Sequence, residues 1–218
     1  LTLLKSHSGA APCVSWDDLA SHLQHPEWRD QRTCLTGIDE LPAGHITPWP
    51  NGGGKSVAVW HAAQFMPDHK TPPFDELAFE LRTAAQGIMR AWGNVSGRLL
   101  VSASGGVDSS LIAAALATTG QDFACLTVAT GDPSGDEREP VRALANALDV
   151  ETFEACYDHR MVDLEVPVSL GLARPSGKAF MQEVRRHANV AAGQFGASAL
   201  FAGNGGDNLF CYLHSAAP

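Results

Sequence analysis

The chain has 218 residues, of which 44% are hydrophobic and 18% are charged, so its composition excludes an intrinsically disordered protein and allows one large domain or two small ones. The formal net charge of −9 argues against a nucleic-acid-binding groove. The sequence contains neither a signal peptide nor an apolar run of the length that spans a membrane. No CxxC pair occurs among the five cysteines, so neither a zinc ribbon nor a disulfide framework is indicated, and we expect a reduced, cytoplasmic protein.

The first pattern in chain order is a short amphipathic helix over residues 14–24. Ser15 is the expected N-cap, and Asp18 stands three residues later in the position of a capping box. His22 and His25 flank this helix, but without a third ligand they are better read as solvated side chains than as a metal site.

Residues 36–60 are rich in turns and favour a β-hairpin. The expected strands are 45–47 and 55–60, joined around a run of glycines at 51–54. The end of this run resembles the last residues of a Walker A loop. That loop is rejected, because Trp49 occupies the place of its first glycine and a strand follows instead of a helix.

A polar stretch with two prolines, residues 68–73, is the best candidate for a linker, so we expect a new domain to begin near residue 74. Helical and strand-like segments then alternate along the chain. The expected helices are 74–92, 108–119, 136–148 and 177–195, and the expected strands are 99–103, 122–129, 150–155 and 198–202. This alternation predicts an α/β fold with a doubly wound, mostly parallel sheet that binds ligands at the carboxyl ends of its strands.

The sequence SGGVDSS follows the first strand of this sheet, at residues 104–110. Gly105 and Gly106 allow positive φ angles and a close approach of a ligand to the backbone. The N–H groups that open the next helix form an anion site, to which serine hydroxyls add donors, so a phosphate chain is the expected ligand. Asp108 would repel phosphate unless a cation lay between them, and we therefore predict that it binds Mg²⁺. The structural alternative is a tight turn with Asp108 as an N-cap.

A second glycine-rich turn, at residues 203–210, reads GNGGDNLF and follows the last expected strand. It repeats the logic of the first site, with a buried strand, a turn of small residues and an acidic residue at the start of a helix. If the two strands are neighbours, Asp108 and Asp207 would face one Mg²⁺–pyrophosphate from two loops. A purely structural turn is again the alternative.

These motifs resemble known families. The loop 104–110 is similar to the PP-loop of ATP pyrophosphatases, which have the adenine nucleotide alpha hydrolase-like fold. Together with Asp136-Glu137 and the turn at 203–210, it resembles the synthetase domain of the asparagine synthetase (glutamine-hydrolysing) family. Residues 37–45 and the hairpin resemble the end of that family's glutaminase domain. The resemblance implies a β-rich C-terminal remnant of a glutaminase-like (Ntn-type) domain at 1–68 and the N-terminal part of the ATP pyrophosphatase domain at 74–218.

The resemblance implies a ligase that uses ATP and Mg²⁺ to adenylate a carboxylate, releases pyrophosphate, and lets an amine capture the acyl group with loss of AMP. The carboxylate would belong to a small molecule or a peptide, the amine to glutamine-derived ammonia or a precursor peptide, and a second copy of the chain is a candidate partner. Carried over, Asp108, Asp207 and Asn204 are the catalytic candidates, and the two aspartates are the metal ligands. The residues expected to bind the nucleotide are Ser102, Ser104, Gly105, Gly106, Val107, Asp108, Ser109, Ser110, Val128, Gly203, Gly205 and Gly206.

Two departures from the family pattern lie in the second turn, where Asn204 and Asn208 replace glutamates. An asparagine side chain cannot accept a proton at neutral pH, so Asn204 cannot serve as a general base. The tail after Asn204 looks more like the lasso-peptide cyclases related to asparagine synthetase, and a catalytically degenerate nucleotide-binding protein is the second alternative. The start at Leu1 and the end at Pro218 suggest a piece of a longer protein, so we expect this chain alone to be inactive.

Overall fold

The computed structural model describes residues 13–26, 28, 30–48, 56–65, 72–168 and 171–206. The chain divides into two compact units, each of which is described by itself. Unit 1 comprises residues 1–71 and 164–179, and unit 2 comprises residues 72–163 and 180–218. The interpretation of residues 1–68 as a glutaminase-like remnant stays a prediction.

A four-stranded sheet forms the centre of unit 2. Its strands are β3 (Leu99–Ser102), β4 (Phe123–Ala129), β5 (Thr152–Cys156) and β6 (Ala199–Ala202), in the order β5-β4-β3-β6. All neighbouring strands are parallel, and β3 lies between β4 and β6. The predicted parallel α/β sheet is therefore confirmed.

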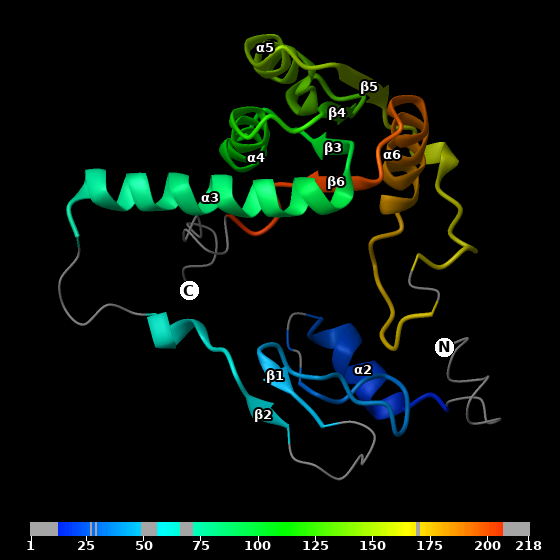
Figure 1. Ribbon diagram of the computed structural model, residues 1–218. Coiled ribbons are helices and arrows are strands. Elements are labelled where there is room, and N and C mark those ends of the chain that lie inside the picture. The colour runs from blue at the N-terminus through cyan, green and yellow to red at the C-terminus, as the bar shows by residue number, and fades with distance from the viewer. Residues whose placement is uncertain are drawn as a thin grey trace. The chain divides into compact units, whose positions relative to one another are not determined.

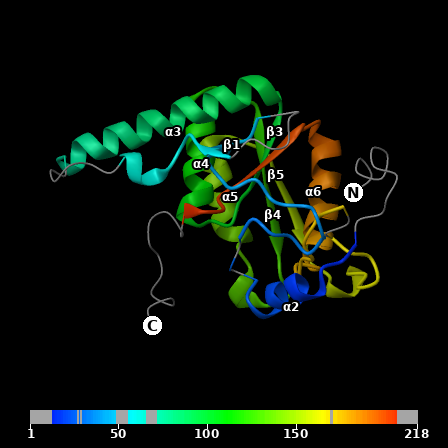
Figure 2. The same ribbon diagram turned by 90° about the horizontal axis from the view of Figure 1, so that it is seen from below.

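Helices cover both faces of this sheet (Figure 1, Figure 2). The elements α4 (Val107–Thr118) and α5 (Arg138–Leu148) lie on one face, and α6 (Met181–Phe195) lies on the other. The long helix α3 (Phe74–Ser96) packs along α4. This arrangement is the doubly wound fold that the sequence predicts.

The apolar run of β3 explains why it occupies the middle of the sheet. Leu99 and Val101 pack toward α4 and α5, whereas Leu100 packs toward α6. All three side chains are at most 1% exposed. A strand that is covered on both faces needs apolar residues at successive positions rather than at alternate ones.

All four helices of unit 2 differ in their bounds from the sequence prediction: α4 is shifted by one residue, α5 begins at Arg138 rather than at residue 136, and α3 and α6 differ most. Helix α3 continues to Ser96 and ends at Gly97, whose φ of 69° is a conformation that glycine adopts without strain. Helix α6 begins at Met181 rather than at residue 177. The segment 164–179, which precedes it, belongs to unit 1.

Unit 1 contains the helix α2 (Trp16–Gln24) and a short antiparallel pair, β1 (His45–Ile46) with β2 (Val57–Ala58). The expected capping box is wrong in one respect. Ser15 precedes the helix, but its hydroxyl donates to the Asp18 carboxylate at 2.6 Å and makes no hydrogen bond to the helix backbone. The glycines at 51–54 lie outside the described residues. No helix in the described ranges has the length and apolar character needed to cross a membrane.

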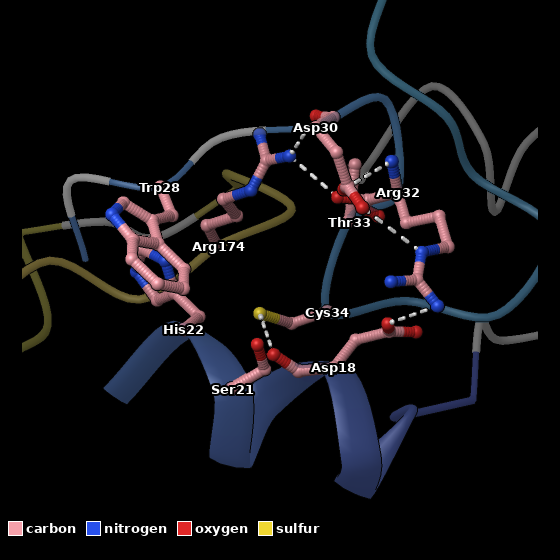
Figure 3. A pocket seen from close by; sticks show the side chains of 9 residues that line it. All are labelled: Asp18, Ser21, His22, Trp28, Asp30, Arg32, Thr33, Cys34 and Arg174. Carbon is pink, nitrogen blue, oxygen red and sulfur yellow. Dashed lines mark hydrogen bonds and ion pairs between the residues drawn. The ribbon is translucent and has the colours of Figure 1, made fainter. Parts of the chain in front are cut away.

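Segment 164–179 is fastened to unit 1 by polar contacts around Arg174. One guanidinium nitrogen of Arg174 donates to the carbonyl oxygens of Asp30 at 2.8 Å and Arg32 at 2.5 Å, and the guanidinium pairs with Glu40. The Cys34 N–H donates to the carbonyl of Ala173 at 3.0 Å. Figure 3 shows Arg174 at the edge of a cavity of about 480 Å³ within unit 1.

Candidate functional site

The two glycine-rich turns meet at the same edge of the sheet because β3 and β6 are adjacent and parallel. In chain order the four strands are arranged 3-2-1-4, so the order reverses between β3 and β6. Ligands of open α/β sheets bind at this reversal, outside the carboxyl ends of the strands. A cavity of about 760 Å³ lies there, lined by Ser102, Ser104, Gly106, Val107, Asp108, Ser109, Ala202, Gly203, Asn204 and Gly206.

Internal hydrogen bonds fix the shape of the first turn. The Ser109 hydroxyl accepts the N–H of Ser104 at 3.2 Å and donates to the carbonyl of Gly106 at 3.3 Å. The Ser104 hydroxyl lies 3.2 Å from that of Ser109 and accepts the N–H of Gly106 at 3.4 Å. Since Ser109 is only 3% exposed, its hydroxyl holds the loop together from inside.

The first turn of α4 supplies the positive end of a helix to the cavity. Gly106 is the N-cap, and the cavity wall includes Val107, Asp108 and Ser109. The first N–H groups of an α-helix have no acceptor within the helix, and the helix dipole adds a partial positive charge. This arrangement favours the binding of a phosphate or another anion at the N-terminus of α4.

The second turn lies directly against the first. A Cβ on Gly203 would stand 2.6 Å from the backbone nitrogen of Ser109 and 2.9 Å from the Cβ of Asp108. A Cβ on Gly206 would collide with the carboxylate of Asp108. At Gly203 only a glycine allows this approach, because the nearest atoms include backbone atoms of Ser109 and Asp108 that cannot move aside.

Most of the predicted site residues line this cavity, and four do not. Gly105 lies in the first turn, and Ser110 lies in α4. Gly205 lies in the second turn with a φ of 108°. Val128 packs on the α6 face of the sheet, against the cluster around Leu100. Asp207 and Asn208 lie outside the described residues.

Sequence reasoning missed two residues near the cavity. Ala202, the last residue of β6, belongs to its wall. Pro140, in the first turn of α5, supports the glycine loop from behind, since a Cβ on Gly105 would stand 2.6 Å from the Pro140 Cβ. Strand ends point to Ala202, but the local sequence carries no sign of the contact with Pro140.

The residues around Asp108 fit a divalent cation shared with phosphate. Asp108 is the only carboxylate among the described residues that line the cavity. Mg²⁺ is commonly held by one or two carboxylates together with phosphate oxygens and water. No group of three or more His, Cys, Asp or Glu side chains that could hold a metal occurs in the described part of the chain.

A cleft with two glycine-rich turns at the reversal of a parallel sheet defines a doubly wound α/β domain with a candidate ligand site at the carboxyl ends of its strands. The sequence profile described as asparagine synthase matches residues 96–217, which is more than half of the chain. The chain belongs to the asparagine synthase family.

Comparison with curated protein sequences gave no match. Among solved structures, the chain is similar to one described as NMN synthetase from Francisella tularensis, with 15% sequence identity and a TM-score of 0.42. The match covers 54% of this chain and 52% of that structure, so the chain spans about half its length.

Proposed function

We propose that this protein is an ATP-dependent, AMP-forming ligase that joins a carboxylate to an amine. The observation that supports the proposal is the contact of the two glycine turns around Asp108, at the edge of the sheet where ligands of this fold class bind. The products would be an amide, AMP and pyrophosphate.

In this proposal the first turn and the start of α4 bind the pyrophosphate portion of ATP. The backbone N–H group of Val107 and the hydroxyl of Ser104 are the donors, and Ser109 keeps the loop in place. Such fixed donors lower the barrier because they are already oriented when charge develops on the leaving group, and one donor is commonly worth about 3–4 kcal/mol. Asp108, together with Asp207, would hold Mg²⁺, which supplies charge neutralisation to the phosphates when bound.

Asn204 bears on the choice of product. It lines the cavity, and its side-chain amide cannot take a proton from an attacking amine at neutral pH. This residue favours, as a second candidate, a lasso-peptide macrolactam cyclase, in which a peptide side-chain carboxylate is adenylated and captured by the peptide's own amine. Asparagine formation from aspartate and glutamine-derived ammonia is the first candidate.

The test has two parts. Calorimetric titration of this chain with pyrophosphate, in the presence of Mg²⁺, should give binding that Asp108→Asn weakens at least tenfold. Asp122→Asn is the control, because Asp122 is an exposed partner of Arg98 on the same unit. In the full gene product, Asp108→Asn should nearly abolish ATP–pyrophosphate exchange. Unchanged binding and exchange in this variant would refute the proposal. Whether the full gene product adenylates aspartate or a peptide side chain would decide between the two products.

A further inference from the structure

The outer side of the glycine loop rests on the first turn of α5. Gly105 has a φ of 70°, and the place where its Cβ would stand is 2.6 Å from the Cβ and 2.9 Å from the Cγ of Pro140. The pyrrolidine ring of Pro140 is rigid, so it cannot move aside as a flexible side chain could. The loop backbone therefore lies close to a rigid ring, at a residue that is not part of the cavity wall.

The first turn of α5 cannot recede from the loop. Val141, the residue after Pro140, is fully buried between α5 and the sheet. Pro140 is the third residue of α5, where the absence of an N–H costs no helical hydrogen bond. The turn is thus anchored to the core one residue away from the contact with Gly105.

A second anchor lies just before the helix. The Asp136 carboxylate accepts the N–H of Arg138 at 3.1 Å and two guanidinium hydrogen bonds from the same residue, at 2.8 and 2.6 Å. The Arg138 guanidinium holds the pKa of Asp136 at about 2, well below its usual range. At neutral pH the segment that leads into α5 is therefore held by the ion pair between Asp136 and Arg138.

We propose that Pro140 is a positioning residue for the glycine loop. It fixes the backbone at Gly105, and thereby directs the neighbouring N–H groups and the Ser104 hydroxyl toward the bound pyrophosphate. This inference rests on the proposed function, but it assigns a role to a residue that touches neither the cavity nor the ligand.

The test removes the ring while preserving the helix. Pro140→Ala keeps the Cβ and favours helix, whereas Pro140→Gly removes every side-chain atom that meets Gly105. We expect the dissociation constant for pyrophosphate with Mg²⁺ to rise about twofold to threefold in Pro140→Ala and fivefold or more in Pro140→Gly. Pro133→Ala, before α5, is the matched control and should leave binding unchanged, because the atoms nearest to a Cβ on Gly105 all belong to Pro140.

A double-mutant cycle separates positioning from simple destabilisation. Gly105→Ala would collide with Pro140, and Pro140→Gly should relieve part of that defect, so the two losses in affinity should be less than additive. Additive losses, or Pro140→Gly binding as tightly as wild type, would overturn the inference and leave the proposed function standing. Absence of pyrophosphate binding by the wild-type chain would overturn both. Thermal unfolding of each variant shows whether the fold is intact, and Pro140→Ala with the cycle decides the question if Pro140→Gly does not fold.

Discussion

Gly203 and Asp108 are 95 residues apart in the chain, yet a Cβ on Gly203 would stand 2.9 Å from the Cβ of Asp108. The two residues meet because β3 and β6 are neighbours and each ends in a turn of small residues. The contact joins the two motifs into one site and leaves no room for a side chain between them.

Gly203→Ala should separate the two turns. Its methyl group would meet the backbone of Ser109, which belongs to a helix and cannot rotate away as a side chain does. We expect at least tenfold weaker binding of pyrophosphate with Mg²⁺, measured by calorimetry. The control is Gly193→Ala in α6, where the added methyl group meets nothing and helix propensity should raise stability by about 0.5–1 kcal/mol. Equal affinity of both variants for pyrophosphate would contradict the close packing of the turns.

Asn204→Glu should weaken binding of pyrophosphate through charge. A glutamate would place a second carboxylate in the cavity that already contains Asp108, and the added charge would repel phosphate oxygens. We expect a threefold to tenfold loss of affinity at pH 7, measured without added metal so that no cation compensates the charge. Asn204→Gln has the same size without the charge and should bind within about twofold of wild type. A similar loss in both variants would show that size, not charge, is the cause.

Ser109→Ala should destabilise the first turn. Ser109 is buried, and its hydroxyl is the acceptor for the Ser104 N–H. Leaving a buried donor without its acceptor costs about 1–3 kcal/mol, so denaturant unfolding should show a loss in this range. Wild-type stability combined with reduced affinity would instead mean that the hydroxyl serves the ligand alone.

Acid should act on unit 2 through Glu183. This residue of α6 is 1% exposed and accepts hydrogen bonds from Arg186 and His187. Arg186 lowers the pKa of Glu183 from 4.5 to about 2. Because the folded pKa lies below the unfolded one, the stabilisation is complete above about pH 4.5 and is lost as the pH falls toward 2.

Glu183→Gln should therefore unfold more easily than wild type at pH 7, and the difference in free energy of unfolding should shrink between pH 4.5 and 2. Denaturant titrations at several pH values measure this difference. Glu154→Gln is a useful comparison, since Glu154 pairs with Arg142 at the edge strand and is more exposed. A difference for Glu183→Gln that does not change with pH would exclude the charged contact as its cause.

The sequence predicts those parts of the structure that depend on local pattern. The apolar run at Leu99–Val101 predicts a buried strand, and the glycines of both turns predict where the two strands end. The sequence leaves the adjacency of these two strands as a condition, which the structure fulfils. The sequence pattern predicts that α3 ends at Trp92, where its apolar stripe ends, but the helix continues to Ser96 and is capped by Gly97. Periodicity reports which face is buried, whereas the end of a helix depends on its cap.

Other features depend on contacts between distant residues and could not be predicted. The hydroxyl of Ser109 is expected to be a ligand donor from its position in the motif, yet it points into the loop. The contact between Gly105 and Pro140 joins the turn between β3 and α4 to the first turn of α5, which are far apart in the sequence pattern. Likewise, nothing in residues 164–179 shows that they pack with the first 71 residues rather than with the sheet.

That last feature bears on how the protein can be divided. A cut between Thr71 and Pro72 lies within the polar stretch 68–73, yet it would separate segment 164–179 from the rest of unit 1. Arg174 would lose Glu40 and both carbonyl acceptors, and the carbonyl of Ala173 would lose the Cys34 N–H. A fragment that starts at residue 72 would thus contain segment 164–179 without the part of unit 1 that it contacts. Co-expression of the two pieces is the better route to a well-behaved sample.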